Sequence, residues 1–100
     1  LGPALVSKES IGDPQKLAVT LVIERDGKEA FRGQANTGDM KRDCEYLVSW
    51  LVRHNSIPDG TSVMTGTGTI PPPEFTLAAG DVVHITIDKI GTLTNTVVVV

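Results

Sequence analysis

The feature that most constrains this fold is a period-two pattern that ends in a two-residue turn. Apolar side chains recur at every second position, at Leu17, Val19, Leu21 and Ile23. This spacing places them on one face of a β-strand. Asp26-Gly27 follows and favours a tight hairpin, because both residues tolerate a positive φ. The pattern therefore predicts an antiparallel hairpin whose second strand covers residues 28–34.

The period changes after this hairpin. From Met40 onward, apolar residues fall on one face of a helix, at Cys44, Leu47, Val48 and Leu51. Thr37 or Asp39 is the expected N-terminal cap. Further strands are predicted at residues 1–6, 62–66, 83–88 and 93–100, and loops at 7–16 and 67–75. About six strands and one helix predict an α+β fold: a mixed, strongly curved β-sheet roll with one helix packed on it.

Composition and charge exclude several functional classes. The chain has 100 residues, of which 40% are hydrophobic and 21% charged, so one ordered domain is expected. The net charge is -3 and no basic stripe exists, which disfavours nucleic-acid binding. Cys44 is the only cysteine, so no internal disulfide can form, and a reducing, cytoplasmic location is expected. Because the chain begins with Leu1 rather than Met, we expect it to be a piece of a larger protein.

The segment 63–73 is the best candidate for a ligand-contacting loop. Gly66 and Gly68 allow a close approach of the backbone to a ligand, and threonines at 65, 67 and 69 supply hydroxyls. Three prolines then restrict the path of the chain. Such a loop suits a carboxylate or an enolate-like oxygen. The alternative interpretation is a rigid connection between two strands. No Lys follows the glycines, so it is not a nucleotide phosphate loop.

The histidines and the cysteine give weaker signals. His84 lies opposite the apolar face of its predicted strand and is expected to face solvent. His54 is expected to end the helix. Neither has a further ligand at zinc spacing. Cys44 lies on the apolar face of the helix and is expected to be a small core residue rather than a nucleophile.

The remaining candidates are single polar residues. Glu74 and Asp88 are expected to be solvated. Ser7 and Ser10 lie near Asp13, but this composition is common in loops and supports no catalytic triad. The residues therefore predict a polar, glycine-rich pocket wall without catalytic acids, bases or metal ligands.

Several separated motifs resemble the C-terminal half of the fumarylacetoacetate hydrolase superfamily. They extend over nearly the whole chain, as Leu1-Gly-Pro3, Gly33-Gln-x-Asn-Thr37-x-x-Met40, Leu47-Val-x-x-Leu51, Pro58-Asp-Gly60, Met64-Thr-Gly-Thr67, Leu77-x-x-Gly80-Asp81-x-Val83 and Ile90-Gly-x-Leu93-x-Asn95. The resemblance implies a mixed β-roll, a homo-oligomer, and Mg²⁺ (or Mn²⁺) bound by an upstream E-x-E and a later Asp. It also implies metal-assisted chemistry on 2-oxo acids, with stabilisation of an enolate. The family's Gly-Thr pair, which contacts the substrate, maps onto Gly66 and Thr67.

The chain also departs from the family pattern. The metal ligands and the upstream catalytic Lys are absent from the 100 residues. We therefore expect residues 1–100 to be the C-terminal part of a larger catalytic domain, inactive without its N-terminal remainder. Many members have Gly-Thr-Pro-x-Gly where this chain has Gly66-Thr-Gly-Thr-Ile-Pro-Pro-Pro73, a variant that resembles the 2-keto-3-deoxy sugar-acid dehydratases.

Three functions remain as hypotheses, two that the resemblance implies and one that competes with it. The first is dehydration of a 2-keto-3-deoxy sugar acid. The second is C–C hydrolysis of an acylpyruvate or a fumarylacetoacetate-like substrate. The third belongs to another class, a non-catalytic β-rich binding or oligomerisation module. An E-x-E motif upstream of Leu1 would favour an enzyme, and its absence would favour the module.

Overall fold

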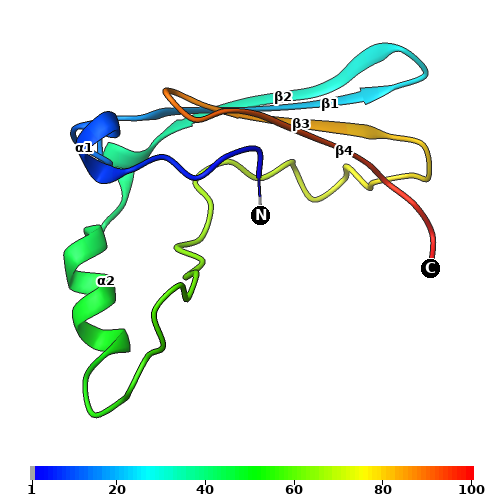
Figure 1. The fold of residues 1–100 in the computed structure, drawn as a ribbon. Helices are drawn as coiled ribbons and strands as arrows, with labels where there is room; N and C mark the ends of the chain where they lie inside the picture. The colour runs from blue at the N-terminus through cyan, green and yellow to red at the C-terminus, as the bar shows by residue number, and fades with distance from the viewer. Residues whose placement is uncertain (1) are drawn as a thin grey trace.

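The predicted hairpin lies at one side of a four-stranded sheet (Figure 1). The computed structural model describes residues 2–100. Its elements in chain order are α1 (Lys8–Ile11), β1 (Ala18–Arg25), β2 (Lys28–Asn36), the 3-10 turn η1 (Thr37–Asp39), α2 (Cys44–Leu51), β3 (Val82–Ile87) and β4 (Gly91–Thr96). The α+β class is confirmed.

The hairpin turn has the predicted geometry. Asp26 and Gly27 have φ angles of 55° and 75°, as a tight turn with two left-handed residues requires. The pairing shifts register between Ile23 and Glu24, which leaves Ala30 as the additional residue on β2. Such a bulge increases the local twist of the sheet. It lies close to the end of β1, where Arg25 is placed.

The sheet has the order β2-β1-β3-β4, and every neighbouring pair is antiparallel. The prediction of a mixed sheet is therefore wrong for the described strands. Two predicted strands are also absent. Residues 62–66 are coil, and so are residues 2–6, while residue 1 of that segment lies outside the described part. Coil is compatible with the positive φ of Gly66 and with Pro3, which has no N–H to donate to a ladder.

The two faces of the sheet differ in polarity, as the alternation predicts. One face carries the apolar side chains of β1 and β3, from Val19, Leu21, Ile23, Val83, Ile85 and Ile87. His84 and Thr86 lie on the opposite face. Buried hydrophobic side chains in the described part of the chain are few, namely Ile11, Leu17 and Ile23. Most of the apolar face is therefore only half-buried.

The helix prediction needs two corrections. First, α2 begins at Cys44 rather than at Met40, and its N-terminal cap is Asp43 rather than Thr37 or Asp39. Thr37 and Asp39 belong instead to η1, a separate turn that Asn36 caps. Second, α2 does not pack on the sheet. It projects from one end of the sheet, and none of its residues is fully buried (Figure 1). The segment 7–16, predicted as a loop, contains the single turn α1, which Ser7 caps. No helix within residues 2–100 is long and apolar enough to cross a membrane.

Candidate functional site

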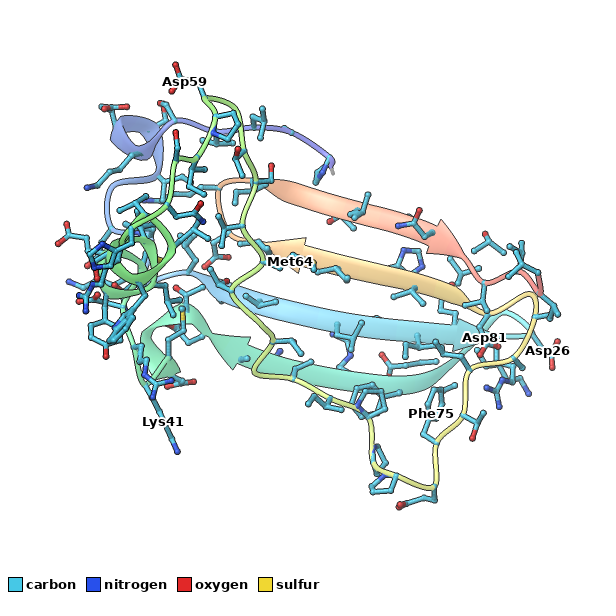
Figure 2. All side chains as sticks on the ribbon, turned by 90° about the horizontal axis from the view of Figure 1, so that it is seen from below. Asp26, Lys41, Asp59, Met64, Phe75 and Asp81 are labelled. Atoms are coloured by element: carbon cyan, nitrogen blue, oxygen red, sulfur yellow. The ribbon has the colours of Figure 1, made fainter. Side chains whose placement is uncertain are left out.

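A long coil, not a helix, crosses the apolar face of the sheet. In Figure 2 it passes from Asp59 across the strands at Met64, reaches β2, and then follows β2 toward Phe75. Two close approaches fix its course along β2. A β-carbon on Gly68 would lie 3.2 Å from Cβ of Ala35, and one on Gly33 would lie 2.9 Å from Oγ1 of Thr69. The candidate loop is thus held directly against a strand.

Gly66 and Thr67 lie on the exposed side of this coil. Gly66 has a φ of +92°, and no atom lies within 4 Å of the position that its β-carbon would take. Thr67 is exposed, and its Oγ1 donates to the carbonyl of Thr69 (3.1 Å) and accepts from the N–H of Thr69 (3.2 Å). A positive φ favours glycine, and the hydroxyl is held in one orientation by its own loop. The pair therefore presents backbone and a hydroxyl to solvent.

Aromatic contacts hold the end of the same coil. The rings of Phe75 and Phe31 lie 6.0 Å apart at an angle of 44°. The guanidinium of Arg25 lies 5.3 Å from the centre of the Phe75 ring, and its Nη2 donates to the carbonyl of Thr76 (2.8 Å). A cation over an aromatic face is attracted to it. These contacts attach the segment after the prolines to the end of β1 and to β2.

A paired, buried carboxylate also lies here. Nε and Nη2 of Arg25 donate to the two carboxylate oxygens of Asp81, at 2.9 and 2.8 Å. Asp81 is 1% exposed, and its Oδ2 also accepts from the N–H of Ala78 (2.9 Å). The hydrogen bonds from Arg25, followed by the one from Ala78, lower the pKa of Asp81 from 3.8 to about 2. The carboxylate is therefore structural, and it is fully paired.

The histidine predictions agree with the structure in part. His84 is half-buried on the polar face, where Nδ1 contacts Oγ1 of Thr94 (2.8 Å) and Nε2 lies 3.4 Å from a carboxylate oxygen of Glu24. It is therefore partnered rather than simply solvated. His54 is exposed and follows α2 with a φ of 55°. Neither histidine lies in the coil that carries Gly66.

The other sequence candidates have structural roles. Ser7 caps α1, because its Oγ accepts from the N–H of Ser10 and donates to Oγ of Ser10. Glu74 is exposed in the turn after the prolines. Asp88 is exposed, and its carboxylate accepts from the N–H of Ala18 (3.0 Å), which fixes the start of β1. Cys44 is half-buried, and its N–H donates to Oε1 of Gln15 (3.3 Å).

No group of three His, Cys, Asp or Glu side chains within residues 2–100 is arranged to hold a metal ion. A hollow lies elsewhere, between α1, the loop after it and α2. Its lining includes Lys8, Asp13, Gln15, Asp43, Cys44 and Ser49. It does not include Gly66 or Thr67, so the candidate loop forms an open wall rather than a closed pocket.

Sequence reasoning missed three residues of this region. In the sequence, Asp81 is only one member of a family motif, and nothing singles out Arg25. Their signal is weak, because they are 56 residues apart. Gly33 carried a clearer signal, since a glycine inside a predicted strand indicates a close approach of another segment.

Comparison with known proteins gives the chain a family. The family model described as fumarylacetoacetate (FAA) hydrolase C-terminal matches residues 1–98. The chain belongs to the fumarylacetoacetate hydrolase family. This agrees with the motifs that run from Gly33 to Asn95.

Similar family members include two sugar-acid dehydratases. The chain is 43% identical over 100 residues to a probable 2-keto-3-deoxyxylonate dehydratase of Haloferax volcanii, covering all of this chain and 35% of that protein. It is 44% identical over 92 residues to a 2-dehydro-3-deoxy-D-arabinonate dehydratase of Saccharolobus solfataricus, covering 92% of this chain and 31% of that protein. A mitochondrial oxaloacetate tautomerase of Xenopus laevis is 35% identical over 102 residues, with coverage of 98% and 31%. The chain spans about a third of the length of these relatives.

A solved structure of the same family has the same fold. A 2-keto-3-deoxy-D-arabinonate dehydratase complexed with magnesium and 2,5-dioxopentanoate superposes with a TM-score of 0.91 at 42% identity. The match covers 95% of this chain and 34% of the dehydratase.

The Arg25–Asp81 pair predicts a specific pH dependence of stability. The folded-state pKa of Asp81 is about 2, below its ordinary value of 3.8. The pair therefore stabilises the fold fully above pH 3.8 and loses this contribution as the pH falls through about 2. Asp81→Asn should lower the urea concentration at which half of the protein is unfolded at pH 7. In this variant, the same midpoint should fall less steeply between pH 4 and pH 2. An equally steep decline in the variant would contradict an ionised, paired Asp81.

Proposed function

We propose that this chain is the C-terminal part of a divalent-metal-dependent enzyme that dehydrates a 2-keto-3-deoxy sugar acid. Gly66 and Thr67 would form its wall against the substrate. The observation that carries this proposal is the exposure of Gly66 and Thr67 on a coil whose next residues lie against Gly33 and Ala35 of β2. Sequence identity supports the substrate class, because it is higher with the two sugar-acid dehydratases (43% and 44%) than with the oxaloacetate tautomerase (35%).

The geometry of Thr67 suits recognition of an anionic oxygen. The N–H of Thr69 donates to its Oγ1 and can hold the oxygen in place. The hydroxyl proton now points to the carbonyl of Thr69 and can turn toward a substrate carboxylate or carbonyl. Gly66 lets the substrate approach the backbone, because nothing fills the position of its β-carbon. This wall would bind and orient the substrate.

The metal would be Mg²⁺, or Mn²⁺ in its place. The similar dehydratase structure is a complex with magnesium. Residues 2–100 of this chain gather no set of three ligating side chains, so they do not fit a metal by themselves. The ligands would therefore come from protein outside these residues.

Exposed apolar surface supports a place inside a larger catalytic domain. Met64 is 97% exposed and Ile70 is 74% exposed on the coil, and Trp50 is 54% exposed on α2. Apolar surface of this kind indicates a buried interface in the assembled protein. We propose that the N-terminal remainder of the enzyme covers this side and closes the sheet into the curved roll. A homo-oligomer in the cytoplasm is the expected form.

This arrangement predicts a difference between the isolated chain and the complete protein. The 100-residue chain alone should bind the hydrophobic dye ANS and show no dehydratase activity, because its apolar side lacks its cover. The full-length protein should bind little dye at the same molar concentration. Fluorescence titration of both, with urea-unfolded samples as controls, measures this difference. Equal and low dye binding would contradict the missing cover.

Thr67→Ala tests the substrate wall in the full-length enzyme. Loss of one hydrogen bond to a charged oxygen, about 1.5–3 kcal/mol, should lower kcat/KM about tenfold to a hundredfold. Thermal unfolding should change little, because Thr67 is exposed. Thr67→Ser retains the hydroxyl and should keep more activity than Thr67→Ala. Full turnover by Thr67→Ala would overturn the assignment.

The choice of substrate in these assays separates the candidate reactions. With Mg²⁺ present, the full-length enzyme should dehydrate 2-keto-3-deoxy sugar acids. Turnover only of acylpyruvates would favour the C–C hydrolase, and turnover only of oxaloacetate would favour a tautomerase. A reading frame without an upstream E-x-E motif, together with no turnover at all, would favour the non-catalytic module.

A pair of glycine variants separates backbone strain from a role in the site. Gly66 and Gly27 have φ angles of +92° and +75°, and each has open space where a β-carbon would lie. Alanine at either position should cost about 1–2 kcal/mol in backbone strain. Only Gly66→Ala should also lower kcat/KM, because Gly27 lies at the hairpin tip. Equal loss of activity in the two variants would indicate a general effect on folding.

A further inference from the structure

Gly33 occupies an unusual position for a glycine, in the interior of a strand. It lies in β2 opposite Leu21, on the apolar face and between Phe31 and Ala35. Glycine weakens a strand, because it has the largest backbone freedom to lose and no side chain to pack. Where it persists inside a strand, another segment often approaches the backbone closely.

The approaching segment is the candidate loop. A β-carbon on Gly33 would lie 2.9 Å from Oγ1 of Thr69, closer than side-chain atoms pack. The same β-carbon would lie 3.1 Å from two atoms of the Phe31 ring. Two residues further along β2, a β-carbon on Gly68 would lie 3.2 Å from Cβ of Ala35. The loop therefore rests on two small residues of β2, Gly33 and Ala35, and a methyl group at position 33 would collide with Thr69.

Thr69 transmits this contact to Thr67. The hydroxyl of Thr67 makes both of its hydrogen bonds to the backbone of Thr69, one to the carbonyl and one to the N–H. Any displacement of Thr69 away from β2 changes the position of these two groups. The orientation of the Thr67 hydroxyl therefore depends on how closely Thr69 lies against Gly33.

We propose that Gly33 is a positioning residue for Thr67. Because Gly33 has no side chain, Thr69 can lie directly against β2. The backbone of Thr69 in turn orients the Thr67 hydroxyl that would face the substrate. This inference rests on the proposed substrate contact of Thr67. Gly33 itself touches no substrate and acts only through the loop.

A double-mutant cycle in the full-length, Mg²⁺-loaded enzyme tests the proposal. The variants are Gly33→Ala, Thr69→Ala and the double variant, assayed on a 2-keto-3-deoxy sugar acid. Gly33→Ala should lower kcat about tenfold to a hundredfold, as expected for a displacement on the scale of 1 Å. In the Thr69→Ala background, which lacks the colliding Oγ1, the same change should cost less than about threefold. A merely structural role of Gly33 would give the same loss in both backgrounds.

A second measurement reports the loop directly. The threonine methyl resonance of Thr67 should shift in Gly33→Ala and return toward its Thr69→Ala position in the double variant. An unshifted resonance with unchanged kcat would overturn the proposal. Equal losses of kcat in the two backgrounds would overturn it as well. The Thr67 resonance could shift in Gly33→Ala while Gly33→Ala and Thr67→Ala both keep full turnover. In that case Gly33 does position the loop, but the proposed contact between Thr67 and the substrate is wrong.

A complementary pair keeps the proposal testable if Gly33→Ala does not fold. Gly68→Ala should lift the loop from Ala35, because its β-carbon would lie 3.2 Å from that methyl group. Ala35→Gly should then restore kcat and the Thr67 resonance in the double variant. Failure of this second pair to show any rescue would also overturn the seating of the loop on β2.

Discussion

The buried carboxylate of Asp81 is the interaction on which the arrangement of this chain depends. It binds the guanidinium of Arg25 at the end of β1 and the N–H of Ala78 in the turn before β3. The backbone carbonyl of Asp81 accepts from Val97, just beyond β4. One residue thus joins the end of the hairpin, the end of the coil and the last strand. A buried charge is tolerated in this place because every part of it is paired.

This junction determines where the coil can run. With its end held at Phe75 and Thr76, the coil crosses the apolar face and then lies along β2. Gly33 and Ala35 permit it to lie close to that strand. The candidate wall is therefore held at its end by the contacts of Arg25 and Phe75. Along β2 it lies close to the strand because Gly33 and Ala35 have little or no side chain. Such support is what a loop needs in order to orient a substrate.

In the proposed function, the described chain supplies one wall of the site and the rest of the protein supplies the reacting groups. Its family includes dehydratases and tautomerases, although the relatives share this segment at 31–44% identity. A wall that orients a 2-oxo acid is compatible with either reaction, because the groups that move protons would determine which one occurs. The exposed apolar side of the coil and of α2 is consistent with this division of roles.

The sequence by itself determined the features that depend on neighbouring residues. These are the hairpin at Asp26-Gly27 and the two faces of the sheet. Each follows from local backbone preference or from a period of two. The extra strands and the extended α2 were predicted wrongly, because local patterns do not reveal whether a segment finds a partner. Only the tertiary structure decided that Arg25 pairs with Asp81 and that Thr69 lies on Gly33, since these partners are distant in the chain and meet only after the sheet has formed.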